Sequence, residues 1–274
     1  MIAKNIKQKI IAYCSQYELY FKIKYSVIIY FFLKQLNANL KNSLKKEYTL
    51  YKEALKGMPS NALIFDIGAN VGNNVEIFLR LGGSIIAVEP DTKNLRCLSA
   101  RFSKNTKVSI IPKALSDSSS QEIIYIQDDG TTLHTLSLKW KNYLTSPKNN
   151  RWENRKRFSK KQLISTISLN HLIDQYGMPY YIKIDVEGYE EKVIKGLDRK
   201  IPLISFEANL PEFLVETLNC LEYLNKLNDQ STYNYSTSDR LILPNFVNYR
   251  EIIEIVTNTD LRYMDIYCRT QVVI

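Results

Sequence analysis

Apolar positions follow one period in the first part of the chain and a mixture of periods in the rest. Up to Gly57 they recur every three or four residues, which predicts a helical extension over residues 1–57. A Gly-Met-Pro-Ser stretch beginning at Gly57 breaks this pattern. Beyond it, short apolar runs alternate with helical patterns, which is typical of buried parallel strands joined by helices. We therefore expect an α/β domain over residues 58–274.

The order of the expected elements indicates how that domain is built. Strands are predicted over residues 62–67, 84–88, 107–111, 121–126, 180–184 and 201–206, and helices over residues 73–81, 91–102, 169–176, 190–197 and 211–227. Alternating strands and helices with right-handed crossovers form a doubly wound, mostly parallel, Rossmann-like sheet. The last stretch, residues 264–273, would add an antiparallel strand at one edge.

The charged residues are unevenly distributed along the chain. The 274 residues are 45% hydrophobic and carry a net charge of +9. Residues 1–57 hold 11 Lys and three Glu, a net charge of +8, and residues 139–161 hold nine Lys or Arg and one Glu, another +8. The remaining residues together have a net charge of −7. A mildly acidic body with two basic segments argues against nucleic-acid binding as the main role.

Several classes of protein are excluded by simple counts. The four cysteines lie far apart and there are only two histidines, so we expect no metal site and a reduced, cytoplasmic protein. The longest apolar run, residues 25–33, is too short to span a bilayer. The Lys-rich residues 1–57 are compatible with peripheral contact to an anionic membrane surface, with packing on the domain, or with a homodimer.

The strongest local signal lies where the first predicted strand meets the first predicted helix. This junction reads Asp66-Ile67-Gly68-Ala69-Asn70-Val71-Gly72. In an open α/β sheet ligands bind at the carboxyl ends of the strands, and glycines let the backbone approach them closely. The acid that opens the motif would repel a pyrophosphate. It suits a ligand with an ammonium group, such as the methionine end of S-adenosylmethionine.

Glu89 ends the second predicted strand, 17 residues after Gly72. An acid at about this spacing accepts hydrogen bonds from ribose hydroxyls in nucleotide-binding folds. We therefore interpret Glu89 as a ribose ligand, with a solvated strand-end carboxylate as the alternative.

A third polar group follows the strand predicted over residues 180–184. Strand alternation would place Lys183, Asp185 and Glu187 on one face, directed at the same crevice. These groups could orient an acceptor, take its proton or hold a divalent cation, although no cation is predicted. An internal salt bridge of Lys183 with a carboxylate is the alternative. His134 is a further candidate base, or a plain polar loop residue.

Residues 139–161 combine positive charge with aromatic side chains. Trp140, Tyr143, Trp152 and Phe158 stand among the Lys and Arg residues, a mixture that can stack on sugars while binding anionic groups. We interpret this basic aromatic insertion as a lid for an acceptor such as an anionic glycan or glycolipid. The alternative is a solvated loop whose aromatic side chains belong to the core.

Taken together, these motifs resemble the FkbM-type methyltransferases. The resemblance covers about residues 60–210 and rests on the segments 66–72, 88–90, 114–117, 183–190 and 206–207. It implies a class I, S-adenosylmethionine-dependent enzyme that methylates hydroxyl oxygens of sugars, glycoconjugates or related natural products. It implies cofactor contacts from Asp66, Gly68, Ala69, Asn70, Gly72, Glu89, Pro90 and Ser116, with Asp185 and Glu187 facing the methyl group. The family's Thr-Leu-Asp segment reads Ser168-Leu169-Asn170 here.

Three other functions stay open at this point. The basic segments suit an RNA methyltransferase, although the acidic body opposes it. A nicotinamide-dependent dehydrogenase conflicts with the glycine spacing, and a non-catalytic binding module has no specific support. The expected partner is a small-molecule or glycan acceptor.

Overall fold

The computed structural model describes residues 38–127, 133–147, 149, 156–237 and 239–271. Most of the predicted helical extension, residues 1–37, therefore lies outside the described residues. Among those described, a seven-stranded sheet has the order β3-β2-β1-β7-β8-β10-β9. Its strands are β1 (Leu63–Ile67), β2 (Ser84–Val88), β3 (Val108–Ile111), β7 (Tyr181–Ile184), β8 (Leu203–Asn209), β9 (Thr232–Ser236) and β10 (Tyr263–Arg269).

The sheet is parallel apart from one strand. β1 pairs in parallel with both β2 and β7, and β10 runs antiparallel to β8 and β9. The chain runs outward from β1 to β3 and then returns to the other side of β1 with β7. Strand order therefore reverses between β1 and β7, and ligands of such folds bind in the crevice at this point. The predicted doubly wound, mostly parallel sheet is confirmed.

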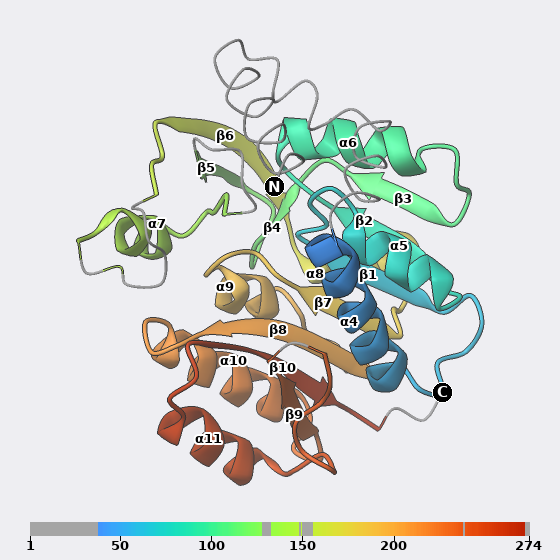
Figure 1. The fold of residues 1–274 in the computed structure, drawn as a ribbon, viewed down its shortest axis with the longest axis vertical. Coiled ribbons are helices and arrows are strands. Elements are labelled where there is room, and N and C mark those ends of the chain that lie inside the picture. The colour runs from blue at the N-terminus through green and yellow to red at the C-terminus, as the bar shows by residue number, and fades with distance from the viewer. Residues whose placement is uncertain (1–37, 128–132, 148, 150–155, 238, 272–274) are drawn as a thin grey trace.

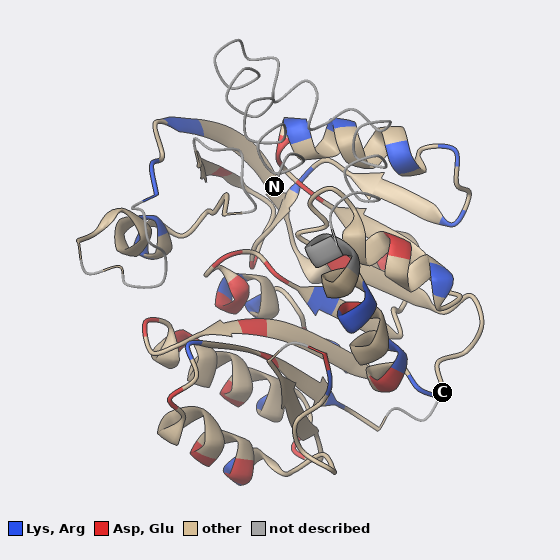
Figure 2. Cartoon of the chain, in the orientation of Figure 1, with Lys and Arg blue, Asp and Glu red and all other residues tan. Residues whose placement is uncertain are grey.

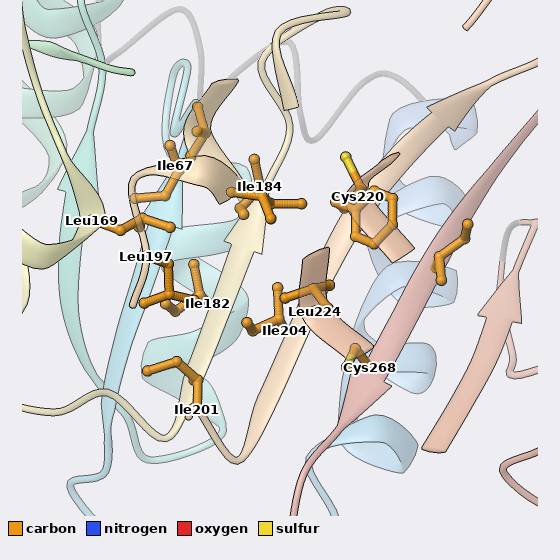
Figure 3. Packing of buried hydrophobic residues seen from close by; sticks show 14 of the residues in the cluster. Ile67, Leu169, Ile182, Ile184, Leu197, Ile201, Ile204, Cys220, Leu224 and Cys268 are labelled. Atoms are coloured by element: carbon orange, nitrogen blue, oxygen red, sulfur yellow. The ribbon is translucent and has the colours of Figure 1, made fainter. Parts of the chain in front are cut away.

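Helices cover both faces of this sheet (Figure 1). One face carries α4 (Ala38–Ala54), α5 (Asn73–Arg80) and α6 (Thr92–Phe102); the other carries α8 (Leu169–Tyr176), α9 (Glu190–Lys195), α10 (Leu214–Leu227) and α11 (Tyr249–Asn258). Figure 3 shows the second face, where isoleucines of β1, β7 and β8 meet leucines of α8 and α10. The sheet between these layers is buried on both sides, which explains why its strands read as continuous apolar runs.

Helix α4 belongs to the folded domain. Leu50, Tyr51, Ala54 and Leu55 are all buried and share a core cluster with α5 and the sheet. The ring of Tyr51 meets Phe78 of α5 edge to face, with 4.8 Å between ring centroids. The described end of the extension therefore packs on the domain, which is one of the alternatives that the sequence left open.

A smaller sheet lies beside the carboxyl ends of the main strands. It has the order β4-β6-β5, with β4 (Ala114–Leu115), β5 (Gln121–Ile126) and β6 (Lys160–Ile167), and α7 (Leu138–Thr145) lies between β5 and β6 in the chain. The segment 139–161 thus begins in a helix and ends in a strand. Sequence periodicity predicted neither of them, nor α11.

Candidate active site

The loop after β1 is held against its neighbouring strands on both sides. The N–H groups of Gly68 and Ala69 both donate to the carbonyl of Val88 at the end of β2, at 3.0 and 2.9 Å. Gly68 has a φ of 83°, and a Cβ placed on it would lie 1.9 Å from the carbonyl oxygen of Asp185, after β7. Only glycine allows this contact, which joins the ends of β1, β2 and β7.

Gly72 has a different role from Gly68. It precedes α5 with a φ of 82°, and a Cβ there would lie 2.6 Å from the Leu98 side chain of α6. Arg101 of α6 completes this junction by donating to the Val71 carbonyl and pairing with Glu76 at 2.8 Å. Gly72 therefore packs the loop against α6. Nothing in the sequence pattern singled out Arg101.

Glu89 lies at the end of β2 with its carboxylate facing the same loop. One oxygen accepts from the Asn70 N–H and the other from the Asp91 N–H, both at 2.8 Å. Burial raises the pKa of Glu89 to about 7, although these two N–H groups lower it. Glu89 is 5% exposed and lines a pocket, and the side-chain amide of Asn94 also donates to it at 3.4 Å.

Asp66 is fully buried on the α4 side of β1. It stands in register with Lys183 of the neighbouring strand β7. Neither carboxylate oxygen has a hydrogen-bond partner among the described residues. Burial raises its pKa to about 6, an effect that the charge of Lys183 partly opposes. A buried carboxylate in this position is stabilised by any ligand that brings a positive charge or a donor to it.

Lys183 and Asp185 form the salt bridge that the sequence offered as an alternative. The Nζ of Lys183 lies 2.8 Å from Oδ2 of Asp185, with 7% of the Lys183 side chain exposed and 39% of the Asp185 side chain. Burial opposes the charge of Lys183, but attraction to Asp185 and Asp66 raises its pKa. Lys183 is therefore a fixed cation beneath the more accessible Asp185.

Glu187 does not continue the strand. β7 ends at Ile184, and Glu187 has a φ of 57°. Its Oε2 accepts from the indole N–H of Trp140 at 3.0 Å. Burial, followed by the neighbouring Asp185 charge, raises the pKa of Glu187 to about 8, and the Trp140 hydrogen bond lowers it.

One pocket collects many of the residues expected from the sequence. Those that line it are Gly68, Asn70, Glu89, Pro90, His134, Asp185 and Glu187. Asp66, Ala69, Gly72, Ser116 and Lys183 are not among its lining residues. The N–H of Ser116 donates to Ile167 at the end of β6, 3.0 Å away, although its neighbours Ala114 and Leu115 do line the pocket.

His134 lies at the β2 side of this pocket. Its Nδ1 accepts from the Gln127 N–H at 3.0 Å, and its Nε2 is 3.9 Å from Oδ2 of Asp91. Asp91 caps α6 directly after the β2 strand end. His134 therefore stands near the predicted ribose ligand, and its role as a base stays a prediction.

The structure places Trp140 of the basic aromatic insertion in the interior of the protein. Trp140 is only 1% exposed, and its ring packs against Phe213 and Tyr143 at centroid distances of 5.5 and 5.4 Å. It belongs to the core, the second of the two alternatives for this segment. Trp152 lies outside the described residues. In the part of the chain that the structure describes, no three His, Cys, Asp or Glu side chains are arranged to hold a metal ion.

Comparison with known proteins identifies the family. The sequence model of one protein family, the methyltransferase FkbM domain, matches residues 66–235, more than half of the chain. The chain belongs to the FkbM methyltransferase family. It is therefore an S-adenosylmethionine-dependent methyltransferase, as the motif resemblance implied. No curated protein gave a significant match.

A search of solved structures matched this FkbM methyltransferase to several methyltransferases at low identity. A precorrin-6y C5,15-methyltransferase from Geobacter metallireducens is 13% identical, with a TM-score of 0.42 over 87% of this chain and 92% of that chain. The plantazolicin methyltransferase BpumL, solved with S-adenosylhomocysteine, is 13% identical, with a TM-score of 0.43 over 88% of each chain. A putative RNA methyltransferase from Pyrococcus horikoshii is 10% identical, with a TM-score of 0.42 over 86% and 85%.

Two acids at the ends of β1 and β2 fit the cofactor of this FkbM methyltransferase. S-adenosylmethionine carries an ammonium group and ribose hydroxyls, which are donors, and a positively charged sulfonium. Asp66, which is buried and has no hydrogen-bond partner among the described residues, and the pocket-lining Glu89 are acceptors that such donors would satisfy. No phosphate has to be accommodated beside these acids.

Proposed function

We propose that this protein methylates a hydroxyl oxygen of a sugar, a glycoconjugate or a related natural product. The observation that carries the proposal is the pair of carboxylates, Asp185 and Glu187, that line the pocket beside Gly68 and Glu89. A hydroxyl loses its proton as it attacks a methyl group, so a carboxylate at this place has a direct use. The sequence also contains no Asn-Pro-Pro-Tyr type of loop, which would clamp a planar amino group.

The ribose and the ammonium group of the cofactor each have a proposed partner. When bound, S-adenosylmethionine supplies the methyl group on a sulfonium that leaves as a neutral thioether. Glu89 would accept from the ribose hydroxyls, and Asp66 would neutralise the ammonium group. Gly68 and Asn70 would let the backbone of the loop approach it closely. The carboxylate charge at this end of the sheet favours a sulfonium over a neutral ligand.

We assign the proton transfer to Glu187. Sequence position alone favoured Asp185, but Asp185 is already paired with Lys183 at 2.8 Å. The pKa of Glu187 is raised to about 8, so its ionised form is a stronger base than an ordinary carboxylate, and one of its oxygens is left for an acceptor hydroxyl. Asp185 and Lys183 would orient the acceptor. Positioning for in-line attack supplies much of the remaining rate.

Charge on the surface bears on the acceptor. Figure 2 shows Lys and Arg along α6 and at one end of β6, and Asp and Glu on α10 and α11. The positive side chains near the smaller sheet support an acceptor that carries an anionic group outside the pocket. Cytoplasmic location, peripheral membrane contact and a homodimer stay predictions. Within the described ranges, each helix is too short or too polar to span a bilayer.

The test is transfer of a radiolabelled methyl group from S-adenosylmethionine into an extract of host cells. We expect the label in a carbohydrate-containing fraction, as an ether that resists mild alkali. Label that is released by ribonuclease would instead establish the RNA methyltransferase alternative. Protection against heat by NAD and not by S-adenosylhomocysteine would overturn the proposal altogether.

A further inference from the structure

Glu187 adopts a left-handed backbone conformation that residues other than glycine rarely adopt. Its φ is 57°, and the next residue, Gly188, has a φ of 83°. A residue with a Cβ is uncommon in this left-handed region and persists there only when its surroundings hold it. Two consecutive residues with positive φ turn the chain sharply between β7 and α9. Oε1 of Glu190 holds this turn locally by accepting from the N–H groups of Val186 and Gly188, at 3.1 and 3.2 Å. Further contacts come from a distant segment.

The first contact holds the main chain. The hydroxyl of Thr135 donates to the carbonyl oxygen of Glu187 at 2.7 Å, and Thr135 is fully buried. The backbone of Thr135 is itself fixed, because it exchanges two N–H to carbonyl hydrogen bonds with Tyr125 of β5. The smaller sheet therefore anchors the turn at Glu187.

The second contact holds the side chain. The indole N–H of Trp140 donates to Oε2 of Glu187, and the indole is fixed by its packing against Phe213. Ser137 caps α7 by accepting from the Trp140 N–H at 3.1 Å. A Cβ on Gly188 would lie 2.8 Å from the Phe213 ring and 3.1 Å from Cβ of Trp140. The turn and the indole thus fit together without spare room.

We propose that Trp140 is a positioning residue of the transfer reaction, acting through Glu187. Together with Thr135 it directs the Glu187 carboxylate into the pocket, with Oε2 engaged and Oε1 left for the acceptor hydroxyl. This inference rests on the proposed function, in which Glu187 takes the proton. Trp140, at the start of the basic aromatic insertion, would then position Glu187 and would not stack on a sugar.

Other charged groups surround this carboxylate and affect its titration. Asp185 on the same loop and Glu190 of α9 disfavour its ionised form, whereas Lys183 of β7 favours it. Glu207 of β8 interacts with Glu187 as well. The test must therefore separate the titration of Glu187 from that of its neighbours, which a Glu187→Gln variant does.

The indole N–H of Trp140 reports on the contact directly by NMR. The chain has two tryptophans, so the ¹H–¹⁵N spectrum contains two indole signals, and a Trp152→Phe variant identifies that of Trp140. We expect this signal to shift with pH, with a midpoint near 8, and to stop shifting in Glu187→Gln. A signal that is unaffected by pH, or that titrates unchanged in Glu187→Gln, would overturn the inference.

Kinetics test the positioning role separately from the contact. Trp140→Phe keeps the aromatic packing and removes the donor, and Thr135→Val removes the hydroxyl. We expect both variants to transfer the labelled methyl at least tenfold more slowly, with S-adenosylhomocysteine bound as tightly as by the wild type. Unchanged transfer in Trp140→Phe would refute the positioning role. A wild type that transfers no methyl would count against the proposed function, and the indole titration would still decide the contact.

Discussion

At the scale of single residues, the buried carboxylate of Asp66 has a charge that depends on what binds beside it. Its carboxylate is fully buried, and both oxygens lack partners in the described part of the chain. With a pKa of about 6, it changes charge just below neutral pH. In the proposed site the ammonium group of S-adenosylhomocysteine is attracted by the ionised form of Asp66, which would couple binding of the cofactor product to ionisation of Asp66.

We expect S-adenosylhomocysteine to bind more tightly as pH rises from 5 to 7, because Asp66 becomes ionised in this range. Titration calorimetry at several pH values measures this dependence. In Asp66→Asn the affinity should be lower at pH 7, by roughly tenfold, or about 1.4 kcal/mol, and the part of the pH dependence below 6.5 should disappear. An unchanged pH profile in Asp66→Asn would mean that another group meets the ammonium.

Gly68 is expected to tolerate no larger side chain. Gly68→Ala should destabilise the fold by more than the roughly 1–2 kcal/mol that a left-handed residue with a Cβ costs, since the new Cβ meets the Asp185 carbonyl at 1.9 Å. Gly82→Ala is the matched control, because Gly82 has a φ of 94° and open space around it. Chemical denaturation compares the two variants. Equal losses would show that backbone strain alone matters at Gly68.

At the scale of elements, α4 packs on the domain and contributes to its stability. Leu50 is 3% exposed in the cluster that joins α4 to α5 and the sheet. Leu50→Ala should lower the free energy of unfolding by about 2–4 kcal/mol, through lost burial and the cavity left behind. Lys52→Ala, on the exposed side of the same helix, should change it by less than about 0.5 kcal/mol. Thermal unfolding of both variants checks this, and equal melting temperatures would place α4 outside the cooperative unit.

Elements whose character is local could be predicted from the sequence. β1, β2 and β7 are buried apolar runs, and the loop after β1 contains the glycines that its conformation requires. α7 and β6 were not predicted, because the segment 139–161 shows no period of its own. The contact of Trp140 with Glu187 joins residues 47 positions apart, and no local pattern encodes it. Likewise, the end of β7 at Ile184 follows from contacts across the fold and not from strand alternation.

At the scale of the whole molecule, several buried acids share one titration behaviour. The pKa values of Glu89 and Glu190 are raised to about 7, that of Asp66 to about 6 and that of Glu187 to about 8. In each case burial is the largest cause, because the charged form loses hydration. The folded protein therefore holds protons that the unfolded chain releases at lower pH.

The sign of the resulting pH dependence follows from proton linkage. Between the unfolded pKa of about 4.3 and the folded pKa of about 8, the folded state binds more protons, so stability should fall as pH rises through this window. Melting temperatures between pH 5 and 8, without cofactor, measure this. S-adenosylhomocysteine should reduce the fall by stabilising the ionised acids. A melting temperature that rises with pH would contradict the raised pKa values.

The central claim is that the pocket at the ends of β1, β2 and β7 binds S-adenosylmethionine. Calorimetric titration of S-adenosylhomocysteine into the wild type and Glu89→Gln tests it most directly, since glutamine keeps the shape of Glu89 and loses its charge. We expect one site per chain in the wild type and affinity at least tenfold weaker in Glu89→Gln, a loss of about 1.4 kcal/mol or more. No binding to the wild type, or equal affinity in the two proteins, would contradict the claim.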